Sequence, residues 1–299
     1  MSSPTPTPTP TLRRDFLRTL AAGSAVLAGA PRLAAATPAW TVGTLNRPWV
    51  KWSCDEMLAG AKAAGYGVLG LQTTSAADAW VASESRDYLV ALKSKLAASG
   101  LQVIQGRLRS REEAAFDVAA ADLRRQIDRA RELGIGTLIN TGTGKPALYA
   151  AWYRCMAHAA AYGADYGVKI VTKPHGAVTA TAADLLRCLE QVNHPNFGVW
   201  YDPGNILHYT GRDPLAEMEP LLPHLTAFTA KDCLGEKQEV MIQLGTGRVD
   251  FPALFRRLKQ AGFRGPVMVE GGAVGETAAV TTRNARANRE FLEGILARG

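Results

Sequence analysis

The sequence predicts an α/β fold made of a single (β/α)8 barrel, in which eight parallel strands alternate with helices around one axis. Three observations support this fold class. Eight short apolar runs alternate with longer amphipathic segments from residue 40 onward. Polar residues directly follow several of these runs, which is where such a barrel carries its chemistry. The chain beyond residue 36 also has close to the ~250 residues typical of one such domain.

The candidate strands are short runs rich in β-branched and other apolar residues. They are Thr41–Leu45, Val68–Gln72, Gln102–Gly106, Thr137–Asn140, Lys169–Thr172, Gly198–Tyr201, Thr226–Ala230 and Pro266–Val269. Eight strands are the number that a closed barrel of this class needs, and closure leaves no sheet edge exposed.

The clearest helix lies between the third and fourth candidate strands, over Ala119–Leu133. Leu123, Ile127 and Ala130 recur on one face of this helix, and charged residues occupy the others. Gly134 is expected to end it, because glycine tolerates the left-handed conformation of a C-terminal cap. Other glycines are expected to end helices in the same way: Gly65, Gly100, Gly163, Gly262 and, less regularly, Gly167.

An open doubly wound sheet is the main structural alternative. Such a sheet needs a glycine-rich phosphate loop after its first strand, and residues 44–49 do not provide one. The segment Gly142–Lys145 lacks the full spacing of a phosphate loop and is interpreted as a turn. We therefore favour the barrel and expect no nucleotide cofactor.

The first 36 residues predict an export signal and not part of the fold. A Pro/Thr tract precedes Arg13-Arg14, which is followed by an apolar, Ala-rich run and by Ala34-Ala35-Ala36. This order is typical of a twin-arginine signal, although a chance arginine pair before a short helix is the alternative. The apolar run is too short for a permanent membrane span. We expect residues 37–299 to form the barrel, exported to the periplasm or outside the cell by the twin-arginine machinery.

Charge and cysteine content set further limits. The formal net charge is +7, and it falls to about +4 without the signal, which is weak evidence for a polyanionic partner. The four cysteines are far apart, form no C-x-x-C pair and give no connectivity. They are interpreted as buried or half-buried free thiols, namely Cys54, Cys155, Cys188 and Cys233.

Polar clusters follow each of the last four candidate strands. These clusters are Lys173-Pro174-His175, Asp202-Pro203-Gly204-Asn205, Lys231-Asp232 and Glu270-Gly271-Gly272. Side chains at the carboxyl ends of barrel strands converge on one mouth. The sequence therefore predicts a site there.

Two segments near the end of the chain carry a resemblance to a known family. Leu244–Phe251 has the form G-x-G-x-(V/I)-D, and after a predicted helix Gly262–Glu270 has the form G-(F/Y)-x-G-x-(L/V)-x-(I/V)-E. This order resembles the last βα unit of the xylose isomerase-like sugar phosphate isomerase/epimerase superfamily, which also contains inosose dehydratases and family-2 AP endonucleases. The resemblance extends from about residue 40 to the end and is more specific in the second half.

The resemblance implies a metal held by Glu, Asp, His and Glu after the fifth to eighth strands, with the two glutamates acting as acid and base. Such a ligand set suits Mn²⁺, Mg²⁺ or a similar ion. Asp202 and Glu270 match two of these positions. Lys173 stands where the family has its first glutamate, and Thr229 stands where it has its histidine. Two of the four expected ligands are therefore replaced.

Several interpretations of Lys173 stay open, with Lys173, Glu270 and Asp202 as candidate catalytic residues. Its ammonium group could replace the charge of the metal. Alternatively, His175, Asp202 and Glu270 could hold a shifted Mn, Mg or Zn ion. Lys173 could also act as a desolvated base or Schiff-base amine. A purely structural ion pair is the remaining alternative.

Other polar or aromatic residues near the predicted mouth are candidate substrate contacts. They are His175, Asn205, His208, Lys231, Asn46, Arg47 and Trp49. Each has an ordinary structural alternative: Asn205 as a turn former, His208 as a surface or capping residue, and Trp49 as part of a packed turn.

The residues and the resemblance together predict an exported isomerase or epimerase of a sugar, keto-sugar or cyclitol, working by proton abstraction next to a carbonyl. A lyase or dehydratase acting by β-elimination and a non-catalytic carbohydrate-binding barrel are the alternatives. Export favours a neutral sugar or glycoside over a phosphorylated one. The endonuclease branch is disfavoured, because ligands are lost and the mild charge predicts no nucleic-acid partner.

Overall fold

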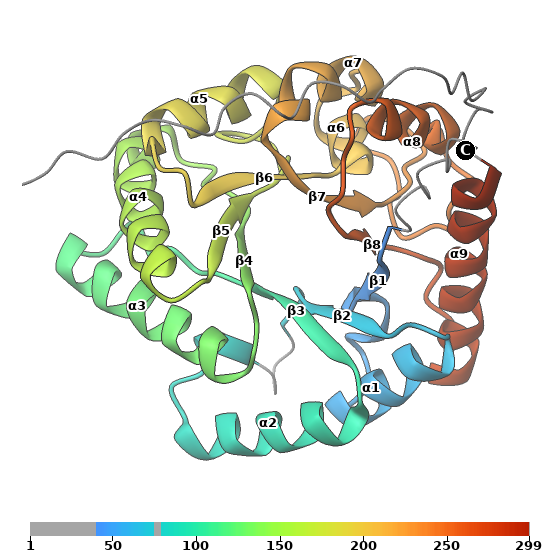
Figure 1. Cartoon of the computed structure of the whole chain (residues 1–299), viewed down its shortest axis with the longest axis horizontal. Helices are drawn as coiled ribbons and strands as arrows, with labels where there is room; N and C mark the ends of the chain where they lie inside the picture. Colours follow the sequence, from blue (N-terminus) through green and yellow to red (C-terminus); the bar gives the residue numbers. More distant parts are fainter. Residues whose placement is uncertain (1–39, 75–78, 299) are drawn as a thin grey trace, which may run out of the picture. The chain divides into compact units, whose positions relative to one another are not determined.

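The computed structural model describes residues 40–74 and 79–298 and confirms the predicted barrel. In the described part of the chain, eight parallel strands form a closed ring in sequence order, with β1 paired to β8. The strands are β1 (Val42–Leu45), β2 (Val68–Leu71), β3 (Gln102–Arg107), β4 (Thr137–Asn140), β5 (Lys169–Thr172), β6 (Phe197–Tyr201), β7 (Leu225–Ala230) and β8 (Val267–Val269). They form the inner ring in Figure 1, with the helices outside.

The predicted strands agree closely with the observed ones. Two have the predicted bounds, and the other six differ by one residue at one end. Short β-branched and apolar runs mark buried parallel strands clearly, because both faces of the sheet are covered. The predicted export signal, residues 1–36, lies outside the described residues.

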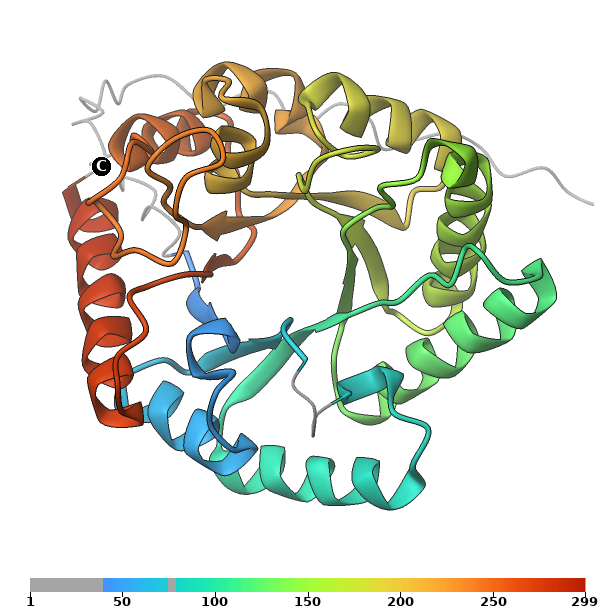
Figure 2. The ribbon, with the colours of Figure 1, turned by 180° about the vertical axis from the view of Figure 1, so that it is seen from behind.

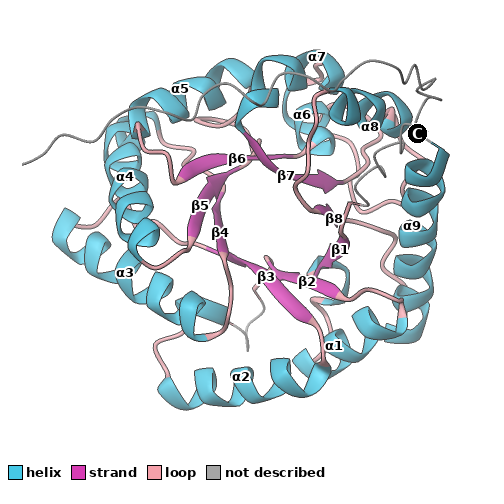
Figure 3. Ribbon diagram, viewed as in Figure 1, coloured by secondary structure: helices cyan, strands magenta, loops and turns pink. Residues whose placement is uncertain are grey.

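Helices surround the ring from both viewpoints, as Figures 2 and 3 show. The α-helices are α1 (Cys54–Ala63), α2 (Arg86–Ser99), α3 (Phe116–Glu132), α4 (Tyr149–Asp165), α5 (Ala182–Val192), α6 (Pro203–Thr210), α7 (Pro214–Met218), α8 (Phe251–Gln260) and α9 (Ala278–Arg298). The 3-10 helices are η1 (Arg47–Trp49), η2 (Trp80–Ala82), η3 (Pro146–Leu148) and η4 (Glu219–His224). Within residues 40–74 and 79–298, no helix is long and apolar enough to span a membrane.

One of the predicted helix-ending glycines has a different role. Gly163 lies inside α4, where a Cβ atom would come 2.4 Å from the carbonyl oxygen of Val168. It allows this close approach of helix and strand instead of ending the helix. Gly167, with φ of +68°, adopts the left-handed conformation at that junction, as Gly134 does after α3 with φ of +74°.

The apolar side chains form two layers. The larger layer fills the space between the sheet and the helices. A smaller cluster fills the inside of the barrel and consists of Leu45, Val68, Ile139, Val171, Trp200, Ala227 and Met268. The four cysteines are all buried, and Cys155, Cys188 and Cys233 are free thiols. The inner cluster shows which residues of seven strands face the barrel axis, and the partly buried Ile104 of β3 packs against it.

Candidate active site

The alternation of strand residues directs three charged side chains to one mouth. Lys173, Asp202 and Glu270 are the first residues after β5, β6 and β8. Each follows by two positions a strand residue that packs inside the barrel. Because successive strand side chains point to opposite faces, the three charged groups lie on the inner side. Lys231 follows β7 in the same phase.

These residues form one buried ionic network. The Nζ of Lys173 lies 2.8 Å from Oδ2 of Asp202 and 2.5 Å from Oε2 of Glu270. The other oxygen of Glu270, Oε1, lies 3.3 Å from Nζ of Lys231 and 3.1 Å from a guanidinium nitrogen of Arg47. Glu270 therefore contacts three cations, and it is the centre of the network.

The pKa shifts separate the two lysines. Burial alone would lower the pKa of Lys173, but Asp202 and Glu270 outweigh it and raise that pKa. Burial would likewise raise the pKa of Glu270, yet the cations lower it below its ordinary value. For Lys231, burial dominates and lowers the pKa, and the carboxylates offset this only in part. Lys173 and Glu270 thus stay ionised, and Lys231 loses its proton more easily.

The donor set does not fit a divalent metal at the family position. The ammonium of Lys173 lies between the two carboxylates that the family uses as ligands, and a protonated amine has no lone pair for a metal. Thr229 is fully buried and its hydroxyl has no hydrogen-bond partner among the described residues. No group of three or more His, Cys, Asp or Glu within residues 40–74 and 79–298 could hold an ion. The shifted site of His175, Asp202 and Glu270 finds no support in this geometry.

The first turn of α6 anchors the network. Asp202 is the N-cap of this helix, and its Oδ1 accepts the backbone N–H of Asn205 at 2.9 Å. The Asn205 side chain donates to the carbonyl of Pro174 at 2.6 Å and accepts from Nζ of Lys231 at 2.8 Å. Asn205 therefore connects the segments after β5 and β7, and Gly204 lets α6 approach the Lys231 backbone.

Asp232 has a structural role beside Lys231. It is fully buried, and its two oxygens accept four backbone N–H groups within 3.1 Å. The donors are Cys233, Gly245, Gly247 and Val249. A carboxylate held in this way fixes the loop that leads into α8.

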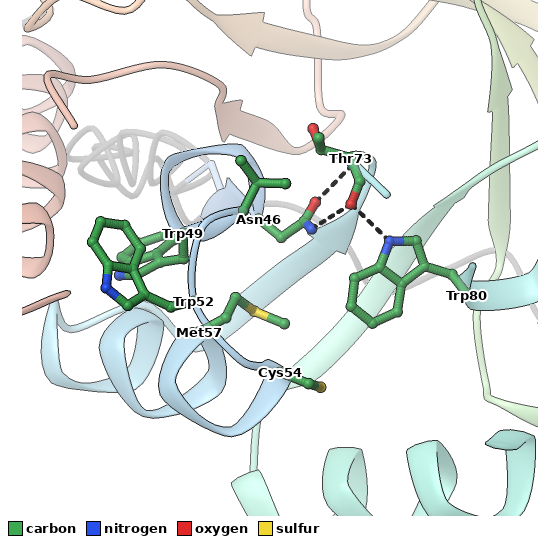
Figure 4. Close-up of a pocket in the computed structure, with 8 residues that line it drawn as sticks. Asn46, Trp49, Trp52, Cys54, Met57, Thr73 and Trp80 are labelled. Carbon is green, nitrogen blue, oxygen red and sulfur yellow. Dashed lines mark hydrogen bonds between the residues drawn. The ribbon is translucent and has the colours of Figure 1, made fainter. Parts of the chain in front are cut away.

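Asn46 and Trp49 lie in packed surroundings after β1. The Asn46 Nδ2 donates to the carbonyl of Thr73 at 2.7 Å, and its Oδ1 accepts two backbone N–H groups. Trp49 is 0% exposed and donates to the Thr282 hydroxyl at 3.3 Å, so the expectation that its indole contacts substrate is wrong: it has no free surface. The cavity next to both residues, shown in Figure 4, holds about 10 Å³, enough for a single water and too small for a sugar.

The two predicted histidines lie at the periphery of the mouth. The Nδ1 of His208 lies 2.9 Å from the carbonyl oxygen of Gln238, so this nitrogen contacts the backbone. His175 is exposed, and its Nε2 lies 3.3 Å from the hydroxyl of Tyr209. Desolvation in the mouth and the nearby lysine charges lower the pKa of His175 to about 4. Its imidazole is therefore neutral near pH 7 and can contact a hydroxyl-rich ligand.

Two residues at the mouth were not singled out from the sequence. Tyr209, in α6, packs against His175 with the rings tilted by 45° and their centroids 5.0 Å apart. Arg107, the last residue of β3, pairs in register with Ile139, an inner residue of β4. The sequence signal for Arg107 is its position at the end of a candidate strand, which is the same signal that identified Asp202.

Known proteins share this architecture. A ketose 3-epimerase from Arthrobacter globiformis is 28% identical over 130 residues, which cover 44% of this chain and 43% of that protein. The match therefore spans less than half of the relative. The D-allulose 3-epimerase of Methylomonas sp. has a TM-score of 0.67 at 20% identity, covering 86% of this chain and 98% of that one.

A second solved structure is a xylose isomerase-like TIM barrel protein from Mycobacterium smegmatis in complex with magnesium. Its TM-score is 0.68 at 15% identity, covering 87% of this chain and 97% of that one. At these identities the structural likeness shows the fold. The family is shown by a family model, described as a xylose isomerase-like TIM barrel, that matches residues 58–294. The predicted resemblance is confirmed: this chain belongs to the xylose isomerase-like TIM barrel family.

Proposed function

We propose that this protein is a sugar epimerase or isomerase that moves a proton on a carbon next to a carbonyl. The family membership and the partial match to a ketose 3-epimerase support the substrate class. The observation that carries the proposal is the buried ammonium of Lys173 between two carboxylates at the mouth. Proton abstraction next to a carbonyl requires a positive group that stabilises the enolate oxygen.

Lys173 supplies that positive group in place of a metal. Its ammonium has three N–H donors, and two of them go to Asp202 and Glu270. The third has no partner among the described residues, and in this proposal it binds a substrate oxygen. Its raised pKa keeps it charged at neutral pH, which favours this role over that of a base or Schiff-base amine.

Lys231 is the proton acceptor in this proposal. Its Nζ contacts Glu270, which also contacts the ammonium of Lys173. Burial lowers the pKa of Lys231 towards the working range of a general base. The amine takes the proton from the carbon, the electron pair moves onto the carbonyl oxygen, and Lys173 stabilises that oxygen. Delivery of a proton from solvent to the opposite face of the same carbon gives an epimer, and the Lys231 ammonium then releases its own proton to solvent. Delivery of the proton to the former carbonyl carbon, while the hydroxyl proton of the first carbon moves to the former carbonyl oxygen, gives an isomer.

Asp202 and Glu270 then act as positioning residues. Glu270, with a pKa lowered by its cations, is a weak base, but it orients the two lysines and Arg47 about one point. Asp202 holds Lys173 through one oxygen and α6 through the other. The sugar hydroxyls are expected to contact His175 and Tyr209 at the rim.

The test is solvent deuterium exchange into D-fructose and D-allulose, followed by NMR at the carbons beside the ketone. We expect exchange by the wild type, no loss after chelation by EDTA, and a loss of about 10²–10³-fold in Lys173→Met. Arg256→Gln, on the exposed outer face of α8, is the matched surface control. Absence of exchange by the wild type, with and without divalent ions across a ketose panel, contradicts the proposal.

A non-catalytic carbohydrate-binding barrel is the second candidate. The observation that favours it is the burial of Lys173, which is 1% exposed and bonded on two sides, as in a purely structural ion network. In that case ketoses would raise the melting temperature without any exchange, and Lys173→Met would alter binding and stability alone.

A further inference from the structure

We infer that the substrate carries an anionic group, a carboxylate or a phosphate, and that Arg107 binds it. This inference rests on the proposed sugar-converting function and specifies the substrate class of the same mouth. It differs from the expectation of a neutral sugar, which was drawn from the predicted export signal alone.

The strand register directs Arg107 inward. In β3, Gly106 pairs with Leu138 and Arg107 pairs with Ile139. Leu138 packs in the outer layer and Ile139 in the inner cluster. Paired residues on neighbouring parallel strands point to the same face, so Arg107 points to the barrel axis. Because it is the last residue of β3, it does so at the mouth.

Arg107 differs from the other cations of the mouth in having no partner among the described residues. Its side chain is exposed, and it makes no ion pair or hydrogen bond within residues 40–74 and 79–298. Arg47 and Lys231, in contrast, both contact Glu270. The charge of Arg107 nevertheless acts on Glu270 and on His175, so it lies on the same side of the barrel as the ionic network.

Four cations and four carboxylates lie at or near the mouth. The cations are Arg47, Arg107, Lys173 and Lys231, and the carboxylates are Asp202, Glu270, Asp232 and Glu239. Asp202 and Glu270 contact the other three cations, and Asp232 and Glu239 accept backbone N–H groups. Among the described residues, no carboxylate lies against Arg107, and an unpaired guanidinium in a concave mouth attracts anions.

The guanidinium group also matches the shape of the ligand group. Its planar fork donates two parallel N–H bonds to a carboxylate or a phosphate, which a neutral hydroxyl cannot accept in the same way. Binding of the anionic end at β3 would leave the carbonyl end towards β5 and β7, where Lys173 and Lys231 lie. Arg107 would thus orient the substrate across the mouth.

Three ketoses that differ in one substituent test this inference: D-fructose, D-fructuronate and D-fructose 6-phosphate. KM and the rate of deuterium exchange are measured for each, and Kd is measured by calorimetry. We expect at least one anionic ketose to have a KM about tenfold or more below that of D-fructose. Arg107→Gln should raise that KM by about 10- to 100-fold, the value of a charge-assisted hydrogen bond. Comparison of the two anions distinguishes a carboxylate from a phosphate ligand.

Control variants separate specific contact from net charge. Arg256→Gln removes the same charge from the outer face of α8 and should leave KM for both anions within about twofold, since distant charges are screened. Arg107→Lys keeps the charge without the fork and should fall between wild type and Arg107→Gln. Equal effects of Arg107→Gln and Arg256→Gln would overturn the inference.

The outcomes also distinguish this inference from the proposed function. Exchange of D-fructose as efficient as that of the anions, with no effect of Arg107→Gln on any KM, overturns the anion inference and retains the sugar-converting function. Arg107-dependent Kd values for an anionic ketose without exchange retain the anion site and remove the proposed reaction.

Discussion

Asn46, after β1, and Asn140, the last residue of β4, are amides that bond to nearby backbone and side chains, whereas the charged residues Lys173, Asp202, Lys231 and Glu270 after β5 to β8 bond to one another across the barrel. Arg47 after β1 joins these ions through Glu270. The side chain of Asn46 forms its hydrogen bonds with the backbone of residues 72 and 73. Asn140 bonds to Leu108, Ser110, Gly142 and Trp152. Lys173 and Glu270, in contrast, are 97 positions apart and lie 2.5 Å from each other.

This difference indicates which part of the mouth carries chemistry. Satisfied buried amides rigidify a scaffold at modest cost. Buried ions lose several kcal/mol of hydration each, and their attraction only offsets this loss when the geometry is good. A cluster of ions in a concave mouth is therefore a candidate for function, and the amide half is a candidate for support.

The largest expected effect is on proton transfer by Lys231. Lys231→Arg keeps a cation near Glu270 but removes a titratable amine, because a guanidinium does not deprotonate in this range. We expect ketose exchange to fall by about 10²–10⁴-fold, the range of general acid–base catalysis. The measurement is the deuterium exchange rate, with Lys145→Arg, an exposed ion pair partner of Glu113, as the matched control.

The pH dependence sharpens this prediction. Burial lowers the pKa of Lys231, so its amine becomes neutral at a lower pH than that of an exposed lysine. The exchange rate should therefore rise with pH and level off below ~10.5, the value of an ordinary lysine. If the exchange rate of Lys231→Arg still rises with pH in the same way, the base is another residue. Lys231 and Lys173 would then not have the separate roles of base and charge-stabilising group.

The next largest effect concerns the stability of the ionic half. Lys173→Met leaves Asp202 and Glu270 buried without their shared counter-ion. We expect the free energy of unfolding to fall by about 3–5 kcal/mol at pH 7.5, the cost of breaking a buried ion pair. Urea unfolding of wild type and variant at several pH values measures it.

The sign of the pH effect follows from the lowered pKa of Glu270. This shift stabilises the wild type above the unfolded pKa of ~4.3, and the contribution is lost as pH falls through the lower folded pKa. In Lys173→Met the Glu270 carboxylate loses one of its cations and takes up a proton at higher pH, so the difference from wild type should shrink below about pH 5. If the difference in the free energy of unfolding between wild type and Lys173→Met does not depend on pH, the loss comes from disturbed packing around the methionine and not from an unpaired buried carboxylate.

The sequence predicted the barrel to within one residue at each strand end because short β-branched runs and glycine-rich junctions are local signals. Asp202 and Glu270 could be predicted for the same reason, since each directly follows such a run. The side of the sheet to which Arg107 points could not be predicted from the sequence. It depends on a register shift in the pairing of β2 with β3, between Leu69 and Gly70, which decides which residues of β3 face the barrel axis. The burial of Trp49 also depends on a distant helix, through Thr282.

The smallest expected effect lies in the amide half. Asn140→Ala leaves the indole N–H of Trp152 and the N–H of Gly142 without their acceptor. We expect a loss of about 1–3 kcal/mol in the free energy of unfolding, the cost of stranding buried donors. Gln191→Ala, an exposed amide of α5, is the control and should change stability by less than ~0.5 kcal/mol. Because no group of the Asn140 side chain titrates, its loss should be constant between pH 5 and pH 8, unlike that of Lys173→Met. A loss for Asn140→Ala that varies with pH would show that the amide half is coupled to the ionic network, and the division of the mouth into support and chemistry would not hold.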